Sequence, residues 1–504
     1  MREMDLDQLI QPLDIRRVAG PSGVRILDIT DDSRTVMPDS LFVARVGPKF
    51  DGRAYIQQTI QSGARAILTD EEGASRIDSS GVAVLVADDV ALTAAQLAER
   101  FYGEPTYRLK LVGITGTNGK TTVAHLLHGI LNRSGIRAGL IGTVEIDDGR
   151  ETAAAELTTP GSIELSRTFA TMVDNGCKVA VMEVSSHALD QKRAAGLSFD
   201  VGVFTTLGTD HMDYHKTRQE YLRAKRRLFE MLPESGVAVV NSDDEACSEM
   251  LEGCKAGVLR CSLRDAASVA RVTSRQVDSV DVALKGAFGS IETRLALAGE
   301  HNAMNLLEAV VVAHELGVER DAIALALEKP NLPRGRLERI HVPGGQHVFI
   351  DFAHTPDALE RTLTELRRSM QDSSHEGKLW AVFGCGGNKD QTKRPVMGEI
   401  AGRLADRIVL TSDNPRTEQP EAIIEAIFKG VEPRRRTDVI REPLREQAID
   451  RVMREAEPGD VILIAGKGHE TTQELSDGAG NIVVRPFDDE ECVRLYARER
   501  AEAT

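Results

Sequence analysis

The sequence has little of three things: cysteine, aromatic residues and long apolar runs. Its 504 residues include six cysteines and one tryptophan, and only 4% are aromatic. The cysteines form no CxxC pair, which argues against a disulfide framework and a zinc site and predicts reduced thiols. They are Cys177, Cys247, Cys254, Cys261, Cys385 and Cys492. No apolar run approaches the roughly 20 residues of a membrane helix, and the start, MREMDLDQLIQP, lacks the apolar core of a signal peptide. We therefore expect a soluble, cytoplasmic chain without membrane insertion.

Positive charge is also in deficit. Lys and Arg number 62 against 78 Asp and Glu, which gives a formal net charge of −16 at pH 7. Such a chain repels a polyanion, so the composition argues against non-specific binding of nucleic acid. A small anionic substrate remains compatible, because a few local basic groups can outweigh the overall field. The hydrophobic fraction of 41% is that of a globular protein, and the length predicts two to four domains.

Short apolar segments alternate with helical patterns along most of the chain. These segments are KLVGIT (110–115), KVAVMEV (178–184), VGVFTT (201–206), GVAVVN (236–241), HVFID (347–351), LWAVFG (379–384), RIVLTS (407–412) and VILIAG (461–466). Continuous apolar strands alternating with helices predict parallel sheets covered on both faces. The first hundred residues indicate a smaller α/β unit, and a Pro/Gly-rich stretch at 331–340 indicates a second boundary. We expect an α/β fold with three domains, 1–107, 108–336 and 337–504.

The segment GITGTNGKTT (113–122) lies between an expected strand and an amphipathic helix, where a phosphate-binding loop belongs. Backbone N–H groups around Gly116 and Gly119 would face phosphate oxygens at the positive end of the helix. Lys120 would neutralise the β- and γ-phosphates, and the Thr121 hydroxyl would approach Mg²⁺. The strict G-x-x-x-x-G-K-[ST] pattern fails because Ile114 stands at the first glycine, and a plain Gly/Thr turn with a surface lysine is the alternative. We expect ATP binding and a P-loop-type central domain with a mainly parallel sheet.

Two further strand ends carry charged groups. Glu183 ends one strand and is followed by the segment VSSHALDQKR, whereas Asp210 and His211 follow another. Ligands of open α/β sheets bind beyond the carboxyl ends of the strands, so these groups should converge on the nucleotide. A carboxylate and a neutral imidazole can serve as Mg²⁺ ligands, although oxygen is preferred. Taken alone, His211 is more often structural than a ligand.

Nine motifs resemble the Mur ligases, and they occur in that family's order over nearly the whole chain. They are TGTNGKTT (115–122), EVSSHALDQKR (183–193), DHMDYH (210–215), YLRAKRRLF (221–229), GEHNAMN (299–305), GRLE (335–338), DFAHTPDAL (351–359), GCGGNKDQTKRPVMG (384–398) and GKGHE (466–470). The resemblance implies a small UDP-binding N-terminal domain, a P-loop-type ATPase domain and a Rossmann-like C-terminal domain that binds an amino acid. It also implies an ATP-dependent ligase of peptidoglycan synthesis. This ligase would add meso-diaminopimelate to the D-Glu carboxylate of UDP-N-acetylmuramoyl-L-Ala-D-Glu through an acyl phosphate.

The same resemblance assigns the site residues. Catalytic roles fall on Lys120, Glu183, His211 and Lys225, and ATP contacts fall on Gly116, Thr117, Asn118, Gly119, Lys120, Thr121, Thr122, Asn302, Arg336 and Asp351, with Asn305 beside them. Contacts to the UDP-muramoyl-dipeptide fall on Ser33, Thr158, Thr159, Ser185, Gln191 and Arg193. Contacts to diaminopimelate fall on Arg394, Asp413, Asn414, Pro415, Arg416, Gly466 and Glu470. Two Mg²⁺ ions are expected on Thr121, Glu183, His211 and Lys225, with Lys225 carbamoylated to N6-carboxylysine. Outside the resemblance, Lys225 would be a lysine on a helix surface.

Arg416 carries the expected choice of amino acid. Its planar guanidinium can pair with the distal carboxylate of diaminopimelate, and Glu470 could take the ammonium. L-Lysine lacks that carboxylate and would leave the arginine unpaired. From the residues alone, the stretch LTSDNPRTEQP (410–420) is a strand end with turn chemistry, and Arg416 is more often a surface residue.

Several alternatives and departures remain. A lysine-adding muramyl ligase, a folylpolyglutamate synthase-like ligase and a non-catalytic ATP-binding protein are the competing interpretations. Thr206 stands where the family usually has Asn, and Asn388 and Lys389 stand where it usually has an Asp-Arg pair. These departures put individual contacts in doubt more than the activity. A monomer is expected.

Overall fold

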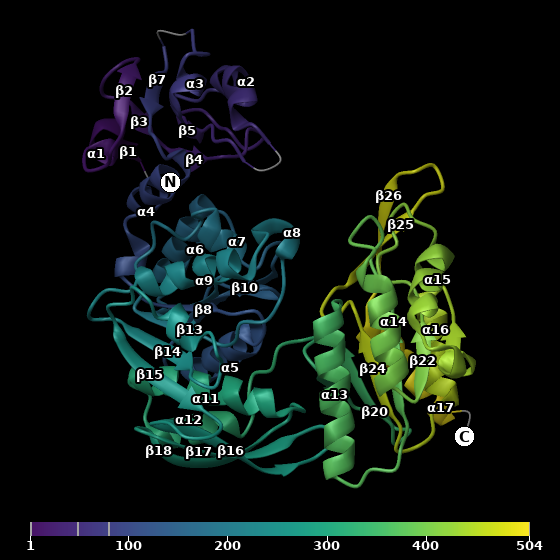
Figure 1. Ribbon diagram of the computed structural model, residues 1–504. Coiled ribbons are helices and arrows are strands. Elements are labelled where there is room, and N and C mark those ends of the chain that lie inside the picture. The colour runs from purple at the N-terminus through teal and green to yellow at the C-terminus, as the bar shows by residue number, and fades with distance from the viewer. Residues whose placement is uncertain (1–2, 48–49, 79–80, 503–504) are drawn as a thin grey trace. The chain divides into compact units, whose positions relative to one another are not determined.

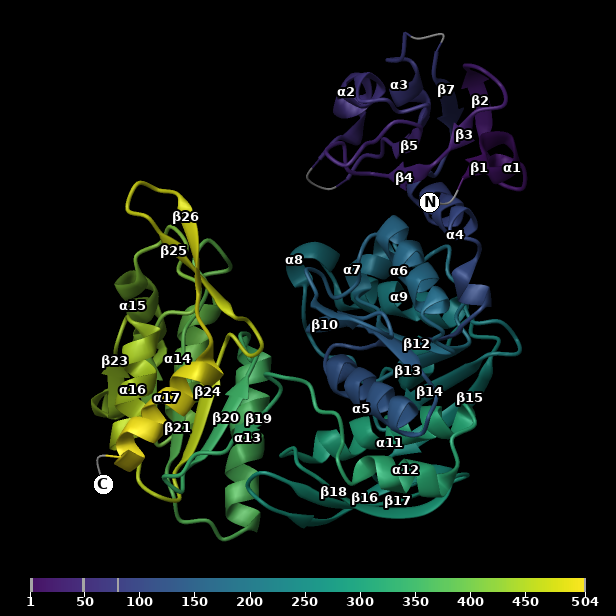
Figure 2. The same cartoon turned by 180° about the vertical axis from the view of Figure 1, so that it is seen from behind.

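The computed structural model describes residues 3–47, 50–78 and 81–502 of the chain (Figures 1 and 2). The chain divides into two compact units, each described below by itself. Unit 1 comprises Met1–Ser262 with Glu308–Val318, and unit 2 comprises Leu263–Leu307 with Glu319–Thr504. Helix α11 (Glu300–Glu315) therefore contributes residues to both units. No helix among the described residues is long and apolar enough to cross a membrane.

The N-terminal part of unit 1 is a small α/β fold built on one sheet. Its sheet has the order β2 (Arg16–Ala19), β7 (Ala83–Val86), β6 (Ala66–Thr69), β5 (Ser40–Val43) and β4 (Asp28–Thr30), parallel except for β2. A short ladder joins β1 (Met4–Asp5) to β3 (Arg25–Ile26). The helices are α1 (Leu6–Ile10), η1 (Gly52–Tyr55), α2 (Ile56–Gln61), α3 (Glu71–Ala74), α4 (Val90–Phe101) and η2 (Pro105–Tyr107). Leu97 and Phe101 of α4 pack with Leu41 and Leu85 of the sheet in one buried cluster.

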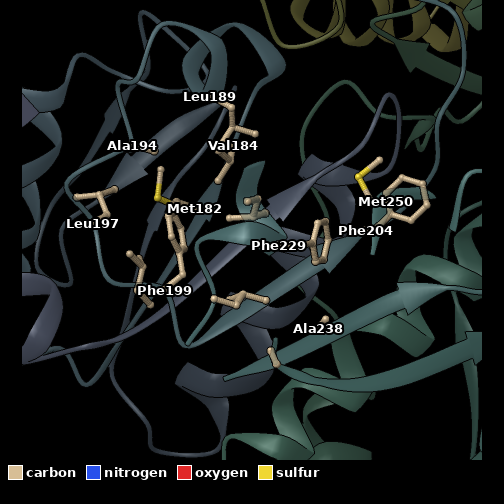
Figure 3. Close-up of a cluster of buried hydrophobic side chains, with 14 of the residues drawn as sticks. Met182, Val184, Leu189, Ala194, Leu197, Phe199, Phe204, Phe229, Ala238 and Met250 are labelled. Atoms are coloured by element: carbon tan, nitrogen blue, oxygen red, sulfur yellow. The ribbon is translucent and has the colours of Figure 1, made fainter. Parts of the chain in front are cut away.

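The central part of unit 1 is a larger, mostly parallel sheet. Its strands have the order β11 (Thr152–Ala154), β10 (Glu145–Asp147), β9 (Ala138–Ile141), β12 (Val179–Glu183), β8 (Lys110–Thr115), β13 (Val201–Phe204), β14 (Val237–Asn241) and β15 (Gly257–Ser262). All neighbours from β9 to β15 are parallel, and β10 and β11 are antiparallel additions. Its helices are α5 (Lys120–Arg133), α6 (Ser162–Asp174), α7 (Ser186–Asp190), α8 (Met212–His215), α9 (Arg218–Glu230) and α10 (Cys247–Met250). Figure 3 shows the buried side chains beneath them, among which Met182, Phe199 and Phe229 join strand, loop and helix. This packing fixes the carboxyl ends of β8, β12 and β13 next to one another.

Unit 2 opens with antiparallel hairpins and continues as a second parallel sheet. The hairpin strands are β16 (Ser268–Arg275), β17 (Val280–Gly286) and β18 (Gly289–Leu295), followed by α12 (Arg320–Leu327). The C-terminal sheet has the order β19 (Glu338–Ile340), β20 (His347–Asp351), β24 (Val461–Ala465), β21 (Leu379–Phe383), β22 (Arg407–Leu410) and β23 (Val439–Arg441), with only β19 antiparallel. Its helices are α13 (Pro356–Asp372), α14 (Lys393–Leu404), α15 (Pro420–Gly430), η3 (Pro433–Asp438), α16 (Arg445–Glu455) and α17 (Asp489–Glu502).

Helices cover both faces of the C-terminal sheet. Alternate strand residues point to opposite sides, so Phe349 packs in the cluster of α13–α15 and Ile350 in the cluster of α16 and α17. The hairpin of β25 (Thr472–Ser476) and β26 (Ile482–Pro486) projects past the end of this sheet (Figures 1 and 2). The expected α/β fold with mainly parallel sheets is confirmed, whereas the boundaries 1–107, 108–336 and 337–504 stay a prediction.

Candidate active site

The phosphate-loop segment connects β8 to α5 and is held by the neighbouring strand. Thr205, just after β13, donates its hydroxyl to the Asn118 carbonyl at 2.5 Å, and the Thr117 amide donates to the Thr206 carbonyl at 2.7 Å. A Cβ on Gly116 would overlap the Thr205 hydroxyl, and Gly119 at the start of α5 has φ +88°. Both positions therefore require glycine. Ile114 lies buried within β8, so the mismatch to the strict motif falls in the strand and leaves the loop intact.

Lys120 lies over the loop that it follows. Its Nζ donates to the carbonyls of Gly116 at 2.9 Å and Thr117 at 3.1 Å. The ammonium thus lies beside the backbone at the positive end of α5, the place where a helix favours an anion. The strand, glycine loop, lysine and helix together form a surface that can bind phosphate.

Glu183 is fully buried at the carboxyl end of β12 and accepts three hydrogen bonds. The Thr121 hydroxyl lies 3.0 Å from its Oε2, the Thr143 hydroxyl lies 3.0 Å from the same atom, and the Thr143 amide donates to Oε1 at 2.8 Å. A carboxyl group beside two hydroxyls offers the hard oxygen donors that Mg²⁺ prefers. The donor set therefore fits the expected ion, and Thr121 and Glu183 are the residues that would hold it.

Lys225 on α9 is buried, with 1% of the residue exposed. Its Nζ donates to the Gly116 carbonyl at 2.7 Å, the oxygen that Lys120 also contacts, and it lies 4.5 Å from the centre of the Tyr221 ring. Burial, and second the charge of Lys120, lower the pKa of Lys225 well below its usual value. The alternative of a lysine on a helix surface is wrong. Burial and the neighbouring positive charge favour the neutral amine, which is the form that carbamoylation requires.

His211 lies just before α8, with a left-handed φ of +55° and nearly half of its side chain exposed. Its ring centre lies 4.7 Å from that of His187 and 6.4 Å from that of Tyr221. His211 therefore lies near Tyr221, the ring that the Lys225 amine also approaches. No group of three or more His, Cys, Asp or Glu side chains in the described ranges is arranged to hold a metal ion. A second ion would thus depend on His211 together with a carbamate on Lys225.

The residues expected to contact the muramoyl-dipeptide lie around Glu183. The Thr159 hydroxyl donates to the Glu183 carbonyl at 2.9 Å and accepts from the Ser185 amide at 3.1 Å. The Thr158 hydroxyl lies 3.1 Å from that of Thr143. These contacts place one side of the expected substrate site next to the phosphate loop.

Arg193 completes this group. It donates to the Thr159 carbonyl at 2.9 Å and to the Gln191 Oε1 at 2.7 Å. Its pKa is lowered by burial and second by the charge of Arg45, because both disfavour the charged guanidinium. An anionic substrate group would offset that cost. Ser33 lies in the turn after β4, which is closed by a 2.7 Å hydrogen bond between the hydroxyls of Thr30 and Thr35.

In unit 2, residues 413–416 follow β22 and residues 466–470 follow β24. These two strands are separated in the sheet by β21 alone. Asn414 donates to Glu470 Oε2 at 3.0 Å, and Lys467 donates to the same oxygen at 2.9 Å. Lys467 is fully buried, so its charge is matched by Glu470. Gly466, with φ +118°, places its backbone next to the Asp413 carboxyl. The two expected amino-acid-binding segments are therefore one connected group.

The arginines of this group differ in their partners. Both terminal nitrogens of Arg394 bind Glu418, each at 2.9 Å, and the residue is 3% exposed. Arg416, in the left-handed region at φ +53°, pairs its Nε with Glu474 at 2.6 Å and donates from Nη1 to the Gly387 carbonyl at 3.0 Å. Both terminal nitrogens of Arg394 are thus bonded to the protein, whereas one terminal nitrogen of Arg416, Nη2, is left for a ligand. The expectation that Arg416 is a surface residue outside the family context does not hold, since its side chain is only 20% exposed.

The other expected nucleotide contacts are held within unit 2. The Asp351 carboxylate accepts from the amides of Leu337 at 2.7 Å and Ala353 at 2.9 Å, and burial raises its pKa. Arg336 lies over the Phe352 ring at 4.9 Å. Asn302 and Asn305 are buried on α11 and joined by a 2.9 Å bond. Each of these roles stays a prediction.

Comparison with known proteins finds three models of one family along the chain. The Mur ligase middle domain matches residues 114–313, the Mur ligase glutamate ligase domain matches 335–468, and the Mur ligase family catalytic domain matches 25–102. The chain belongs to the Mur ligase family. Relatives named UDP-N-acetylmuramoyl-L-alanyl-D-glutamate–2,6-diaminopimelate ligase include one from Phocaeicola vulgatus, 37% identical over 98% of this chain and 100% of its own length. Another, from Chlorobaculum tepidum, is 41% identical over 97% of this chain and 96% of its own.

Solved structures agree with the family assignment. A ligase structure with the same name superposes with a TM-score of 0.70 at 28% identity, covering 99% of this chain and 100% of that one. A Thermotoga maritima MurF ligase in complex with ADP superposes with a TM-score of 0.62 at 18% identity, covering 95% and 98%. At that identity the second likeness shows the fold alone.

Three residues near the sites of this Mur ligase were missed by sequence reasoning. Thr143 lies between strands and its only signal was a Gly-Thr pair after an apolar run. Lys467 was passed over although it lies inside the GKGHE motif, because an apparently exposed loop lysine gave no reason to expect burial. Glu474 lies four residues beyond that motif and 58 residues from Arg416, and no sequence spacing relates two positions so far apart.

Proposed function

We propose that this Mur ligase adds meso-diaminopimelate to the D-Glu carboxylate of UDP-N-acetylmuramoyl-L-Ala-D-Glu, with cleavage of ATP to ADP and phosphate. The observation that carries the proposal is the direct contact between the phosphate loop and a buried carboxylate, Thr121 with Glu183 at 3.0 Å. Relatives that bear this activity in their names match nearly the full chain. The residue Arg416 supports diaminopimelate over L-lysine.

Different site residues act in the two chemical steps, which are formation of an acyl phosphate and then of an amide. Lys120 and the N-terminus of α5 bind and orient the ATP phosphates. Thr121 and Glu183 would hold Mg²⁺, which would supply charge neutralisation for phosphoryl transfer. Arg193 and Thr159 orient the muramoyl substrate whose carboxylate is phosphorylated. The amine of diaminopimelate then attacks the acyl phosphate: a C–N bond forms, the acyl C–O bond breaks, phosphate leaves, and the amine loses a proton.

Residues of unit 2 bind the incoming amino acid and select it. Arg416 presents a guanidinium nitrogen to the distal carboxylate, and Glu470 with Asn414 faces the distal ammonium. An amino acid without the distal carboxylate would leave the desolvated guanidinium partly unpaired, which is the usual basis of strong discrimination.

Phosphate release by the purified protein tests the proposal. We expect release from MgATP only when UDP-N-acetylmuramoyl-L-Ala-D-Glu and meso-diaminopimelate are both present. The product, analysed by mass spectrometry, should be the UDP-muramoyl-tripeptide. Equal turnover with L-lysine would overturn the choice of amino acid, and phosphate release without the muramoyl substrate would overturn the proposed reaction. Lys120→Ala is the matched inactive control.

A further inference from the structure

The guanidinium of Arg416 is fixed on two of its edges by the protein. The Glu474 carboxylate on β25 forms an ion pair with Nε at 2.6 Å. The Gly387 carbonyl accepts a hydrogen bond from Nη1 at 3.0 Å. A Cβ on Gly386 would lie 3.1 Å from Nη1, so the glycine loop after β21 closes against the same nitrogen. Within the described part of the chain, Nη2 has no hydrogen-bond acceptor. One edge of the fork therefore remains for a ligand.

The hairpin that carries Glu474 is bonded to the arginine's own loop. The Arg416 amide donates to the Glu474 carbonyl at 3.1 Å, and the Glu474 amide donates to the Asn414 side chain at 3.0 Å. The buried Gln473 donates to the Asp413 carbonyl at 2.7 Å and is itself held by Arg485 of β26, also at 2.7 Å. Residues 413–416 thus take their conformation in part from β25 and β26.

We propose that Glu474 is the positioning residue that orients Arg416 to read the distal carboxylate of the amino-acid substrate through Nη2. Glu474 does not touch the substrate in this arrangement; it removes the rotational freedom of the arginine before binding. A side chain held in its bound geometry binds more tightly, because less conformational entropy is lost on association. Glu474 is therefore a determinant of amino-acid specificity that acts through Arg416. The inference rests on the proposed function and adds a residue to it.

The charge of Glu474 has a second consequence. In the free protein the negative charge of Glu474 offsets the positive charge of Arg416. The arginine therefore attracts anions in general less strongly. A substrate carboxylate must then approach along the open edge, in the direction that the guanidinium plane sets. Loss of Glu474 should relax this directional requirement as well as weaken binding.

Steady-state kinetics of Glu474→Ala and Glu474→Gln test the inference. For Glu474→Ala we expect the KM for meso-diaminopimelate to rise about tenfold, the usual order for a lost charge-assisted hydrogen bond. The kcat and the KM values for ATP and the muramoyl substrate should change less than about twofold, as expected when only binding of one substrate is weakened. The preference for diaminopimelate over L-lysine, measured as a ratio of kcat/KM, should fall. Glu474→Gln keeps an acceptor for Nε and should recover part of the loss.

Glu425→Ala is the matched control, since Glu425 makes a similar 3.0 Å pair with Arg441 in the same part of the chain. It should leave the diaminopimelate KM unchanged, and its melting temperature should match that of Glu474→Ala. An unchanged diaminopimelate KM in Glu474→Ala, or equal effects on all three substrates, would overturn the inference. Failure of the wild-type protein to use diaminopimelate would instead overturn the proposed function, so the two failures are told apart by the wild-type measurement.

Discussion

Burial sets what the amine of Lys225 can do. The side chain is almost fully enclosed, and desolvation with the nearby charge of Lys120 keeps its pKa well below the usual value. A neutral amine can attack CO₂, and loss of a proton to solvent would then leave an anionic carbamate. Such a carbamate would give Lys225 an anionic oxygen that can bind Mg²⁺, whereas an ammonium at this position would repel the ion.

Lys225→Ala should therefore reduce ligase activity at least about 100-fold, the order seen when an electrostatic group of the transition state is lost. A short-chain carboxylic acid added to the variant should restore part of the activity, because it can occupy the volume of the carbamate and supply its charge. Phosphate release with and without the acid measures both effects. The exposed Lys255→Ala should behave as wild type. Full activity of Lys225→Ala would contradict the role.

Single residues were predictable where a motif carried them. The loop glycines, Glu183 and Thr121 came from strand ends and motif spacing, and the structure brings them together. The partners of Arg416 and Glu470 were not predictable, because side-chain pairing between distant loops leaves no periodic signal. The burial of Lys467 depends on which loops converge above β22 and β24, which is a property of the folded sheet.

Among the elements, α16 and α17 support the strand ends that carry the proposed amino-acid site. Arg445 at the start of α16 and Asp489 at the start of α17 form an ion pair with two 2.7 Å bonds, and both side chains have no exposed surface. The same guanidinium donates to the carbonyl of Ser412 at 3.3 Å and to that of Ala465 at 3.1 Å. One buried pair thus ties two helices to the ends of β22 and β24.

Arg445→Met should lower the free energy of unfolding by about 3–5 kcal/mol, because it leaves Asp489 buried without a partner. Combining it with Asp489→Asn should recover part of the loss, since the unpaired charge is then removed. Denaturant unfolding monitored by circular dichroism measures both variants. Arg451→Met, which breaks an exposed 2.7 Å pair with Glu455 on the same helix, should change the stability by less than about 0.5 kcal/mol. A similar small effect for Arg445→Met would show that the pair adds nothing.

The elements themselves were predicted unevenly. Buried parallel strands such as KLVGIT, which became β8 (Lys110–Thr115), were found because they are continuous apolar runs. The antiparallel strands β16–β18 were missed, because buried and exposed residues alternate along them and no continuous apolar run marks them. The β25–β26 hairpin was missed for the same reason: most of its residues are partly or fully exposed, so apolar periodicity is weak.

At the scale of the whole molecule, the two compact units carry different parts of the expected sites. The phosphate loop and Glu183 lie in unit 1, whereas Arg416 and Glu470 lie in unit 2. A chain with more than one unit need not unfold in a single step. A ligand stabilises the unit that binds it by RT ln(1 + [L]/Kd), which is about 2.7 kcal/mol at a hundredfold excess over Kd.

Differential scanning calorimetry should therefore resolve two transitions that respond to different changes. A Mg²⁺-bound non-hydrolysable ATP analogue should raise chiefly the transition of unit 1, which holds the phosphate loop, and Lys120→Ala should reduce that rise because the phosphates lose their cation. Arg445→Met should lower the other transition, since its contacts all lie within unit 2. Helix α11 is divided between the units at Leu307 and Glu308, so a rigid helix would couple them. A single transition displaced equally by the nucleotide and by Arg445→Met would show that the two units unfold together, and would contradict this prediction.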